Sequence, residues 1–313
     1  MISVNARAMQ IVEEMRIDKE RLGVKVNALP CGTQVLDCTY GGIEAGRCYS
    51  CVCTGGLAEI SFSSGRVHVS TDNPLLACMA SQYAGWNIKV KYKREGEERK
   101  FSASGSGPAR SLARVEKLFD EIDYKDSCER AIITLEVRDS PGDEVAEFIA
   151  QKCGVIPENL CILFAPTASL VGSVQISARV VEVGMHKMRL LGFDLRKIVS
   201  ACGSAPIPPV GKDDRDAMGK SNDCILYGGE THYSTNCPDE EIEKIIEKVP
   251  SSSSKDYGKP FARILAQSNF EFFKIDPSLF APASVAIDNV KTGKTWKVGK
   301  IDREILEKSL CAC

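Results

Sequence analysis

Residues 171–191 read Val-Gly-Ser-Val-Gln-Ile-Ser-Ala-Arg-Val-Val-Glu-Val-Gly-Met-His-Lys-Met-Arg-Leu-Leu, and the rest of the chain can be organised around them. The run is apolar enough for a buried helix, yet Arg179, Glu182, His186 and Arg189 are spaced three, four and three residues apart. At about 100° per residue, these four side chains share one narrow stripe of the helix. Because Arg and Glu are rarely buried without a partner, the pattern predicts an internal ion pair or the wall of a cleft.

This polar stripe has two interpretations, and the pattern does not separate them. In the first, Arg179 and Glu182 form a structural ion pair that braces two domains. In the second, Glu182 is a general base, and Arg179, one turn away, keeps it ionised and oriented. A nearby positive charge lowers the pKa of a carboxyl group whereas burial raises it, so the balance for Glu182 stays open at this point.

The composition is that of an ordinary soluble globular protein. The chain has 313 residues, of which 43% are hydrophobic and 26% charged, and this length favours about two domains. A net charge of −2 with both signs mixed argues against a dedicated nucleic-acid or membrane surface. There is no long apolar span, and the charged residues 13, 14 and 16 do not fit a signal peptide. We therefore expect a cytoplasmic protein.

Fourteen cysteines are a high number for one chain. As imidazole ligands, only His68, His186 and His232 are present, and none of them has a zinc-like spacing with two cysteines. We interpret the cysteines as reduced, small, mostly buried apolar residues. Nothing in these residues therefore supports a metal site.

Periodicity and turn signals predict both strands and helices. A strand at 131–137, a helix at 142–152 and a strand at 160–164 form an α/β unit directly before the central helix. Further strands are expected at 24–29, 34–38, 46–53, 66–70 and 223–227, hairpins within 89–101 and 283–298, and helices at 5–16, 75–85, 239–249, 261–268 and 301–310. The rigid connector 206–209, Pro-Ile-Pro-Pro, suggests a domain boundary.

A glycine-rich loop at 105–110, Gly-Ser-Gly-Pro-Ala-Arg, opens onto a predicted helix at 111–119. Exposed amides at such a place can hold a phosphate or a carboxylate, and Arg110 would add positive charge. Glycine-rich turns are also common without a ligand, so both readings stay open.

Several ordered blocks now identify a family. They are 44–47, 55–58, 71–74, 80–86, 105–110, 165–170, 206–210, 217–223 and 274–283. With these blocks the chain resembles the methenyltetrahydromethanopterin cyclohydrolases, archaeal enzymes of one-carbon metabolism in methanogens and their relatives. The family's catalytic arginine and glutamate match Arg179 and Glu182, which favours the functional interpretation of the stripe.

The resemblance implies a fold, an assembly and a reaction. The fold would be mixed α/β (α+β), with two domains and a deep pocket between them, assembled as a homotrimer. We place residues 1–88 and 206–313 in one domain and residues 89–205, with the central helix 173–191, in the other. The enzyme would interconvert the 5,10-methenyl and 5-formyl forms of tetrahydromethanopterin without a metal or a cofactor, because the methenyl carbon of the amidinium-like substrate is already electrophilic.

Contacts with the pterin coenzyme are expected from two groups of side chains. Amides and carboxylates that suit the amino and lactam edges of the ring are Asp72, Gln82, Asn222 and Asp223. Positive charges that suit the phosphate and the carboxylate of the tail are Arg47, Arg110 and Lys220. Each of these residues could instead be a cap, a turn residue or a solvated surface base.

Two other classes of function compete with this reading. One is a tetrahydromethanopterin-binding protein that has kept the fold without turnover, against which the intact Arg179 and Glu182 argue. The other is a thiol or metal redox protein, which only the number of cysteines suggests. His186 follows Glu182 by one turn, and we interpret it as a buried histidine with satisfied hydrogen bonds rather than a support for the pair.

Overall fold

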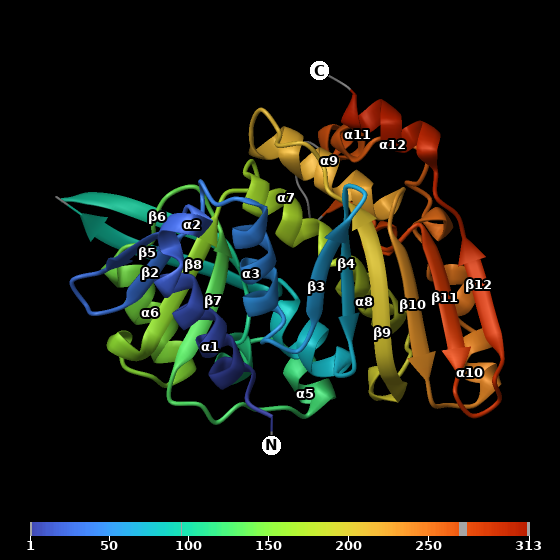
Figure 1. The fold of residues 1–313 in the computed structure, drawn as a ribbon, viewed down its shortest axis with the longest axis horizontal. Coiled ribbons are helices and arrows are strands. Elements are labelled where there is room, and N and C mark those ends of the chain that lie inside the picture. Colours follow the sequence, from blue (N-terminus) through green and yellow to red (C-terminus); the bar gives the residue numbers. More distant parts are fainter. Residues whose placement is uncertain (1, 95, 269–273, 312–313) are drawn as a thin grey trace.

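Two mixed sheets lie side by side in the computed structural model, which describes residues 2–94, 96–268 and 274–311 (Figure 1). The first sheet has the order β1 (Lys25–Ala28), β2 (Gln34–Asp37), β8 (Leu160–Ala165), β7 (Ala131–Glu136), β6 (Glu97–Ser106) and β5 (Trp86–Arg94). The second sheet has the order β12 (Thr295–Gly299), β11 (Ser284–Asn289), β10 (Glu230–Thr235), β9 (Ile198–Pro206), β4 (Arg66–Thr71) and β3 (Glu59–Ser63). The predicted mixed α/β class is confirmed.

The centre of the first sheet is buried on both faces. β8 runs parallel to both β2 and β7, and parallel strands with helices on both faces consist of nearly continuous apolar residues. Ile132 and Leu163 pack towards α1 (Val4–Ile17) and α3 (Ile43–Cys53), whereas Ile133 and Ile162 pack towards α6 (Asp143–Cys153). The predicted strand–helix–strand unit at 131–164 is therefore present.

The strand predicted at 46–53 is wrong, because these residues form the helix α3. The buried positions include Ala45, Tyr49 and Val52, which recur at the three- and four-residue spacing of a helix. Gly46 lets α3 approach α7 (Leu170–Ser177) closely, since a Cβ there would lie 2.8 Å from Cβ of Val174. Packing between the two helices thus overrides the strand preference of the individual residues.

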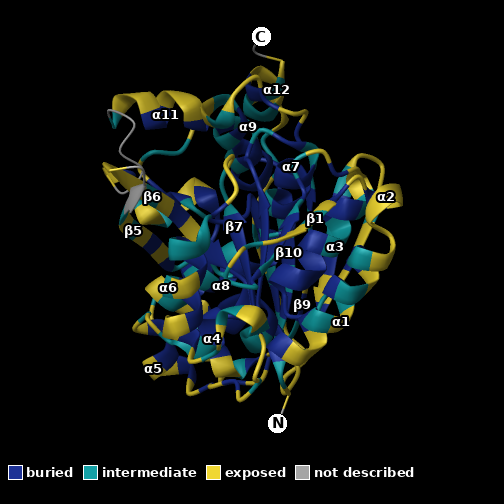
Figure 2. Ribbon diagram, turned by 90° about the vertical axis from the view of Figure 1, so that its left-hand side faces the viewer, coloured by how far each residue is buried: buried dark blue, intermediate teal, exposed yellow. Residues whose placement is uncertain are grey.

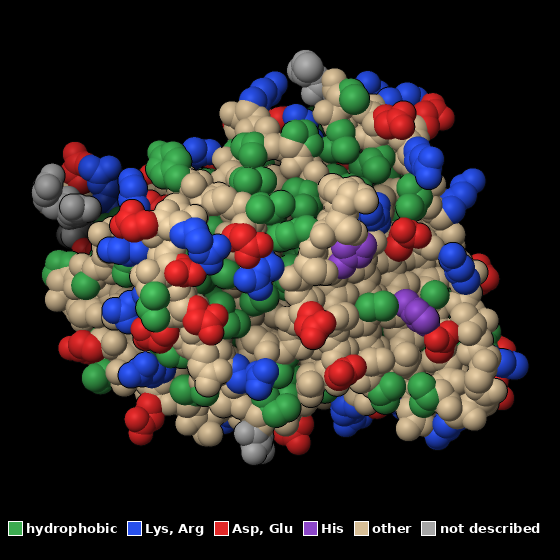
Figure 3. Space-filling model, in the orientation of Figure 1, with side chains coloured by type: hydrophobic (Ala, Val, Ile, Leu, Met, Phe, Trp, Pro, Cys, Tyr) green, Lys and Arg blue, Asp and Glu red, His purple; other side chains and the backbone are tan. Residues whose placement is uncertain are grey.

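The second sheet is covered on one face only. Along β4 and β10, buried residues alternate with more exposed ones, as expected for a half-buried sheet. Val69 and Tyr233 belong to the core beneath α8 (Val180–Leu190). The opposite face carries mostly small and polar side chains, among them His68 and His232 (Figure 3). Across the molecule, buried residues concentrate in the strands, and exposed ones on outlying helices such as α2 (Lys19–Leu22) (Figure 2).

The single central helix predicted over 173–191 is wrong, because the chain forms two helices, α7 and α8. The backbone N–H of Arg179 donates to the carbonyl of Ile176, three residues back, which tightens and ends the first helix. The carbonyl of Ala178 instead accepts from the side-chain amide of Gln82 at 3.1 Å. Arg179 consequently stands at the start of α8 rather than inside a continuous helix.

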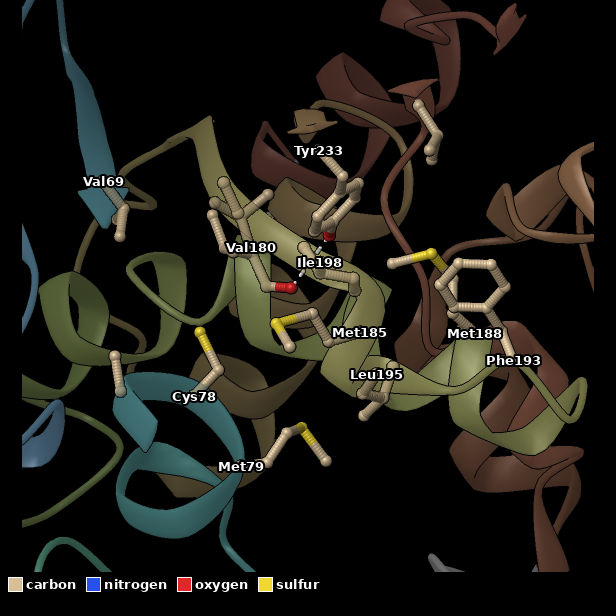
Figure 4. Packing of buried hydrophobic residues seen from close by; sticks show 14 of the residues in the cluster. Val69, Cys78, Met79, Val180, Met185, Met188, Phe193, Leu195, Ile198 and Tyr233 are labelled. Atoms are coloured by element: carbon tan, nitrogen blue, oxygen red, sulfur yellow. Dashed lines mark hydrogen bonds between the residues drawn. The ribbon is translucent and has the colours of Figure 1, made fainter. Parts of the chain in front are cut away.

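The helix α8 is held tightly against the second sheet. The hydroxyl of Tyr233 donates to the carbonyl of Val181 at 2.8 Å (Figure 4). A Cβ at Gly184 would lie 2.0 Å from that hydroxyl oxygen, so only glycine fits there. Met185 and Cys78 fill the space between α8 and the π-helix η1 (Leu75–Gln82), as Figure 4 shows. The positions of Arg179 and Glu182 are therefore set by both the sheet and η1.

The remaining helices are α4 (Arg110–Ala113), α5 (Leu118–Ile122), α9 (Asp214–Leu226), α10 (Asp239–Glu243), α11 (Phe261–Gln267) and α12 (Arg303–Leu310). The strand predicted at 223–227 is wrong, because residues 214–226 form the helix α9. The side chain of Asp213 caps this helix by accepting from the backbone N–H groups of Arg215 and Asp216. Within the described residues, no helix is long and apolar enough to cross a membrane.

The two sheets divide the chain differently from the predicted domain boundaries. Strands β1 and β2 precede residue 88, yet they join the sheet that contains residues 131–165. Strand β9 (Ile198–Pro206) lies before residue 206 except for its last residue, yet it pairs with β4 and β10 of the second sheet. The two tryptophans are also divided, since Trp86 begins β5 in the first sheet and Trp296 lies in β12 of the second. The domain boundaries stay a prediction.

Candidate functional site

Arg179 and Glu182 lie where η1, the end of β6 and the junction of α7 and α8 meet. The guanidinium of Arg179 donates from Nη1 to the carbonyl of Gln82 at 2.5 Å and from Nη2 to the hydroxyl of Ser106 at 3.1 Å. Its Nε and Nη2 also donate to Oε1 of Gln175, at 3.1 and 3.0 Å. Arg179 thus fastens three separate segments of the chain together.

The carboxylate of Glu182 is buried, with 4% of the residue exposed. Its Oε2 lies 4.0 Å from Nη1 of Arg179, which is an ion pair but too long for a hydrogen bond. Burial raises the pKa of Glu182 to about 7, although Arg179 and, further away, Arg110 oppose this. Of the two opposing effects on the pKa of Glu182, burial therefore outweighs the positive charge of Arg179, and Glu182 exchanges its proton near neutral pH.

Gln82 is the one predicted pterin contact that touches this pair. Its Nε2 donates to the carbonyl of Ala178, whereas its Oε1 is buried and has no hydrogen-bond partner among the described residues. A buried acceptor without a donor costs free energy unless a ligand or water supplies one. Gln82 therefore offers an acceptor beside Arg179.

The rest of the predicted polar stripe faces the same side of α8. The ring of His186 stacks on Tyr83, with centroids 4.9 Å apart and planes inclined by 21°. Arg189 donates from Nε to Glu121 of α5 at 2.6 Å. Burial, together with the positive charge of Arg189, lowers the pKa of His186 to about 4, so this imidazole is neutral at pH 7. The stripe thus forms a wall that contacts Tyr83 after η1 and Glu121 of α5.

Arg110 is fully buried and already holds protein partners. Its Nε and Nη2 donate to the two carboxylate oxygens of Glu116 at 2.7 and 2.6 Å. Its Nη1 donates to the carbonyls of Met79 and Ser81 at 3.0 and 2.9 Å. These contacts tie the loop after β6 to the end of η1, so Arg110 supports the segment that carries Gln82.

The three candidates on α9 lie apart from Arg179. Asp223 is buried, and its carboxylate accepts from the backbone N–H of Phe261 and from the hydroxyl of Ser309. Burial raises the pKa of Asp223 to about 7. Asn222 donates to the carbonyl of Met218. Lys220 pairs with Asp216 at 2.9 Å on the edge of a cavity of about 420 Å³ between α9, α11 and α12.

Arg47 and Asp72 lie at the uncovered face of the second sheet. Arg47 pairs with Glu44 one turn earlier in α3, at 2.8 Å, and lines a hollow of about 880 Å³. Asp72 lines a neighbouring hollow of about 440 Å³, together with Arg7 and His232. The structure therefore brings Gln82, Arg179 and Glu182 together, places Arg110 beside them as a support of η1, and distributes the other candidates over separate places.

Three further polar residues of the site were not predicted. Ser106 contacts Arg179 directly, and so does Gln175, whose Nε2 lies 3.4 Å from Oε2 of Glu136. Gln175 precedes Arg179 by four residues, a helical spacing that could have identified it. Ser106 and Glu136 stand at the ends of β6 and β7, and their contact with the site depends on the pairing of those strands.

Cys48 and Cys51 have the Cys-x-x-Cys spacing of some redox and zinc sites, which the interpretation of the cysteines left out. Both are free thiols in α3. Burial raises the pKa of each thiol, that of Cys51 to about 11, which disfavours the thiolate. The described part of the chain contains no group of three or more His, Cys, Asp or Glu side chains placed to hold a metal ion.

This arrangement suits proton transfer at a buried carboxylate. Glu182 is a carboxylate that accepts a proton near neutral pH, and a base with such a pKa is efficient at that pH. Arg179 has five N–H groups, of which four are used by Gln82, Gln175 and Ser106. The remaining N–H of Nη1 belongs to the atom that lies 4.0 Å from Glu182.

Comparison with known proteins shows extensive similarity. Residues 3–310 match the model of a family described as "Cyclohydrolase (MCH)". The chain is 42% identical to the methenyltetrahydromethanopterin cyclohydrolase of Methanococcoides burtonii, over 99% of this chain and 98% of the relative. It is 43% identical to the protein of the same name from Methanocaldococcus jannaschii, with the same coverage. A third relative of that name, from Methanothermobacter marburgensis, is 42% identical over 99% of both chains.

Proposed function

The chain belongs to the cyclohydrolase (MCH) family, and from this we propose that it reversibly hydrolyses 5,10-methenyltetrahydromethanopterin to 5-formyltetrahydromethanopterin. The observation that carries the proposal at the site is the buried pair of Arg179 and Glu182, which do not touch each other. The separation of 4.0 Å is longer than a hydrogen bond, so the donors of Arg179 do not occupy the carboxylate of Glu182 that would take the proton.

The proposed reaction needs a base and a correctly placed water. The methenyl carbon is bonded to two nitrogens and carries positive charge, so it needs no Lewis acid. Glu182 takes a proton from a water molecule while the oxygen of that water bonds to the methenyl carbon. Such general-base catalysis is typically worth about 10²–10⁴ in rate. The bond from the carbon to N10 then breaks. N10 takes the proton that Glu182 accepted, and the new hydroxyl loses its proton to solvent as it becomes the carbonyl of a formyl group on N5, so one proton is released overall.

Arg179 would orient this water. Given the 4.0 Å between Nη1 and Oε2 of Glu182, an oxygen atom about 2.8 Å from each of them fits between the two groups. The water would accept a hydrogen bond from Arg179 and donate one to Glu182. These two hydrogen bonds would point a lone pair of the water oxygen towards the substrate. Correct placement of this kind contributes to rate independently of proton transfer.

Substrate binding is proposed on a broader set of residues. Gln82 would accept a hydrogen bond from the pterin or the water through its unpartnered Oε1. We also keep as proposals the substrate contacts expected of Asp72, Arg47, Lys220, Asn222 and Asp223. Arg110 would act on the substrate indirectly, through the loop that it supports. We also propose a deep pocket between two domains, a cytoplasmic homotrimer, and catalysis without a metal or a further cofactor.

The test is hydrolysis of methenyltetrahydromethanopterin, followed by the loss of its near-ultraviolet absorbance, for the wild type and Glu182→Gln. Turnover by the wild type in the presence of a chelator, with a loss of about 10² or more in folded Glu182→Gln, supports the proposal. Glu121→Gln is the matched control, because Glu121 of α5 pairs with Arg189, which lies about two turns beyond Glu182 along α8.

Two results would contradict the proposal in different ways. If Glu182→Gln keeps the wild-type rate, the base is another group and the pair is structural. If the wild type binds the pterin but does not hydrolyse it, the chain is a tetrahydromethanopterin-binding protein instead.

A further inference from the structure

Gln175 occupies a special position beside the pair. Its Oε1 accepts from both Nε and Nη2 of Arg179, so one acceptor holds one whole edge of the guanidinium. The other edge is held by the carbonyl of Gln82. Without these two acceptors, the nearby carboxylate of Glu182 would be the strongest acceptor for a buried guanidinium.

The amide of Gln175 is itself oriented by a carboxylate. Its Nε2 lies 3.4 Å from Oε2 of Glu136, and the other oxygen of Glu136 accepts from the hydroxyl of Thr167. A carboxylate accepts hydrogen bonds and does not donate them, so Glu136 requires the NH₂ group of Gln175 to face it. The carbonyl oxygen of Gln175 must then face Arg179.

We infer that Gln175 is a positioning residue that holds Arg179 apart from Glu182, and that Glu136 fixes the direction of the Gln175 amide. This inference rests on the proposed function, because the gap it preserves is the one proposed for the water. Without Gln175, the guanidinium closes on Glu182, forms a direct ion pair and displaces the water. The base would then be both neutralised and covered.

The charged and titratable groups around Glu182 come from several elements. Arg179 and Arg110 supply positive charge. Cys78 and Tyr83 face it from η1 and the turn after it, and Tyr233 faces it from β10. Burial raises the pKa of all three of these groups, so they are neutral near pH 7. His186, on the same helix, is neutral as well. A change in the titration of Glu182 therefore reports the position of Arg179.

The first test is Gln175→Leu, which keeps the approximate size of the side chain but removes both hydrogen-bonding groups. We expect kcat for hydrolysis to fall by about tenfold or more, and the low-pH limb of the kcat profile to move down by about one pH unit, because a direct pair stabilises the carboxylate. A lower kcat with an unmoved limb would overturn the inference. A rise in KM alone would instead make Gln175 or Glu136 a substrate contact.

A second set of variants keeps the inference testable if Gln175→Leu does not fold. Gln175→Glu places two carboxylates against each other, and we expect about a tenfold loss of kcat. The exchanged double variant, Glu136→Gln with Gln175→Glu, again has a donor at 136 and an acceptor towards Arg179. We expect it to recover most of this loss. Additive losses in the double variant would contradict the inference.

A measurement without turnover separates this inference from the proposed reaction. The carboxyl stretching band of Glu182, identified by its absence in Glu182→Gln, can be titrated by infrared difference spectroscopy in wild type and Gln175→Leu. A downward shift in Gln175→Leu supports the positioning role even if the wild type hydrolyses no pterin. An unshifted titration overturns it even if the wild type is an active cyclohydrolase.

Discussion

Two buried arginine–glutamate pairs lie close together in this molecule, and they differ in whether the partners touch. Arg110 and Glu116 form two hydrogen bonds of 2.6 and 2.7 Å, and the arginine is completely buried. Arg179 and Glu182 are 4.0 Å apart, and the donors of the arginine go to a carbonyl, an amide and a hydroxyl.

The difference shows how the same two residue types serve structure in one place and chemistry in another. In the closed pair, all charges are compensated by protein groups, and the loop after β6 is fixed to η1. In the open pair, the neutral groups of Gln82, Gln175 and Ser106 satisfy the arginine, so the carboxylate keeps its lone pairs for a proton. The role of such a pair therefore depends on which groups accept the hydrogen bonds of the arginine, and not on the presence of the two residues alone.

The largest effect on stability should come from breaking the closed pair. Arg110→Leu removes the guanidinium that donates to Glu116 and to the carbonyls of Met79 and Ser81, of which Ser81 keeps the backbone N–H of Gly107 as a donor. We expect a loss of about 3–5 kcal/mol in the free energy of unfolding, measured with urea, because one partner of a buried pair is left uncompensated. A loss below 1 kcal/mol would show that the buried network relaxes, and that the closed pair is not structural.

The open pair should appear in the pH dependence of stability. The folded pKa of Glu182, about 7, lies above its ordinary value of 4.5, so the folded state binds this proton more tightly. The resulting stabilisation is complete below pH 4.5 and is lost as pH rises through 7, by about 3 kcal/mol in total. Glu182→Gln has no carboxyl group to titrate at this position, so its stability should not show this decrease. The difference in the free energy of unfolding between variant and wild type should therefore change by about 3 kcal/mol between pH 4 and 8.

The rate of hydrolysis should follow the same proton. A general base acts when ionised, so kcat should fall as pH drops through about 7 and be roughly tenfold below its plateau at pH 6. His186 does not titrate in this range, because its pKa is about 4. The residual activity of Glu182→Gln should lack this limb. If the low-pH limb persists in Glu182→Gln, it arises from the titration of another group.

The smallest effect is expected at an exposed pair of the same residue types. Arg47 and Glu44 are one turn apart in α3, and both side chains are more than a third exposed. Arg47→Met should change the free energy of unfolding by about 0–1 kcal/mol, because solvent screens such pairs. A loss comparable to that of Arg110→Leu would mean that burial is not what distinguishes the pairs.

The sequence revealed the polar stripe and the mixed α/β class because both depend on local periodicity. Arg179, Glu182, His186 and Arg189 do face one side of α8. Arg179, His186 and Arg189 contact Gln82, Tyr83 and Glu121, and Arg110 acts on Glu182 through its charge. Strands β7 and β8 were recognisable from their mostly apolar residues.

The parts that sequence reasoning missed depend on contacts between distant segments. The break at Ala178 follows from a hydrogen bond with Gln82, ninety-six residues away in the chain. The helix α3 follows from its packing against α7 at Gly46, which its strand-forming residues do not indicate. Ser106 and Glu136 reach the site only after β6 and β7 pair. The protonation of Glu182 could not be predicted either, because burial is a property of the folded chain.

The division of the two tryptophans between the sheets gives each half of the molecule its own optical signal. Trp86 is buried in β5, four residues after Gln82, whereas Trp296 is partly exposed in β12, beside Lys294. If either tryptophan is replaced with phenylalanine, the remaining tryptophan fluorescence comes only from the other sheet. Fluorescence can then follow the site-bearing half and the far edge of the second sheet separately during binding, assembly and denaturation.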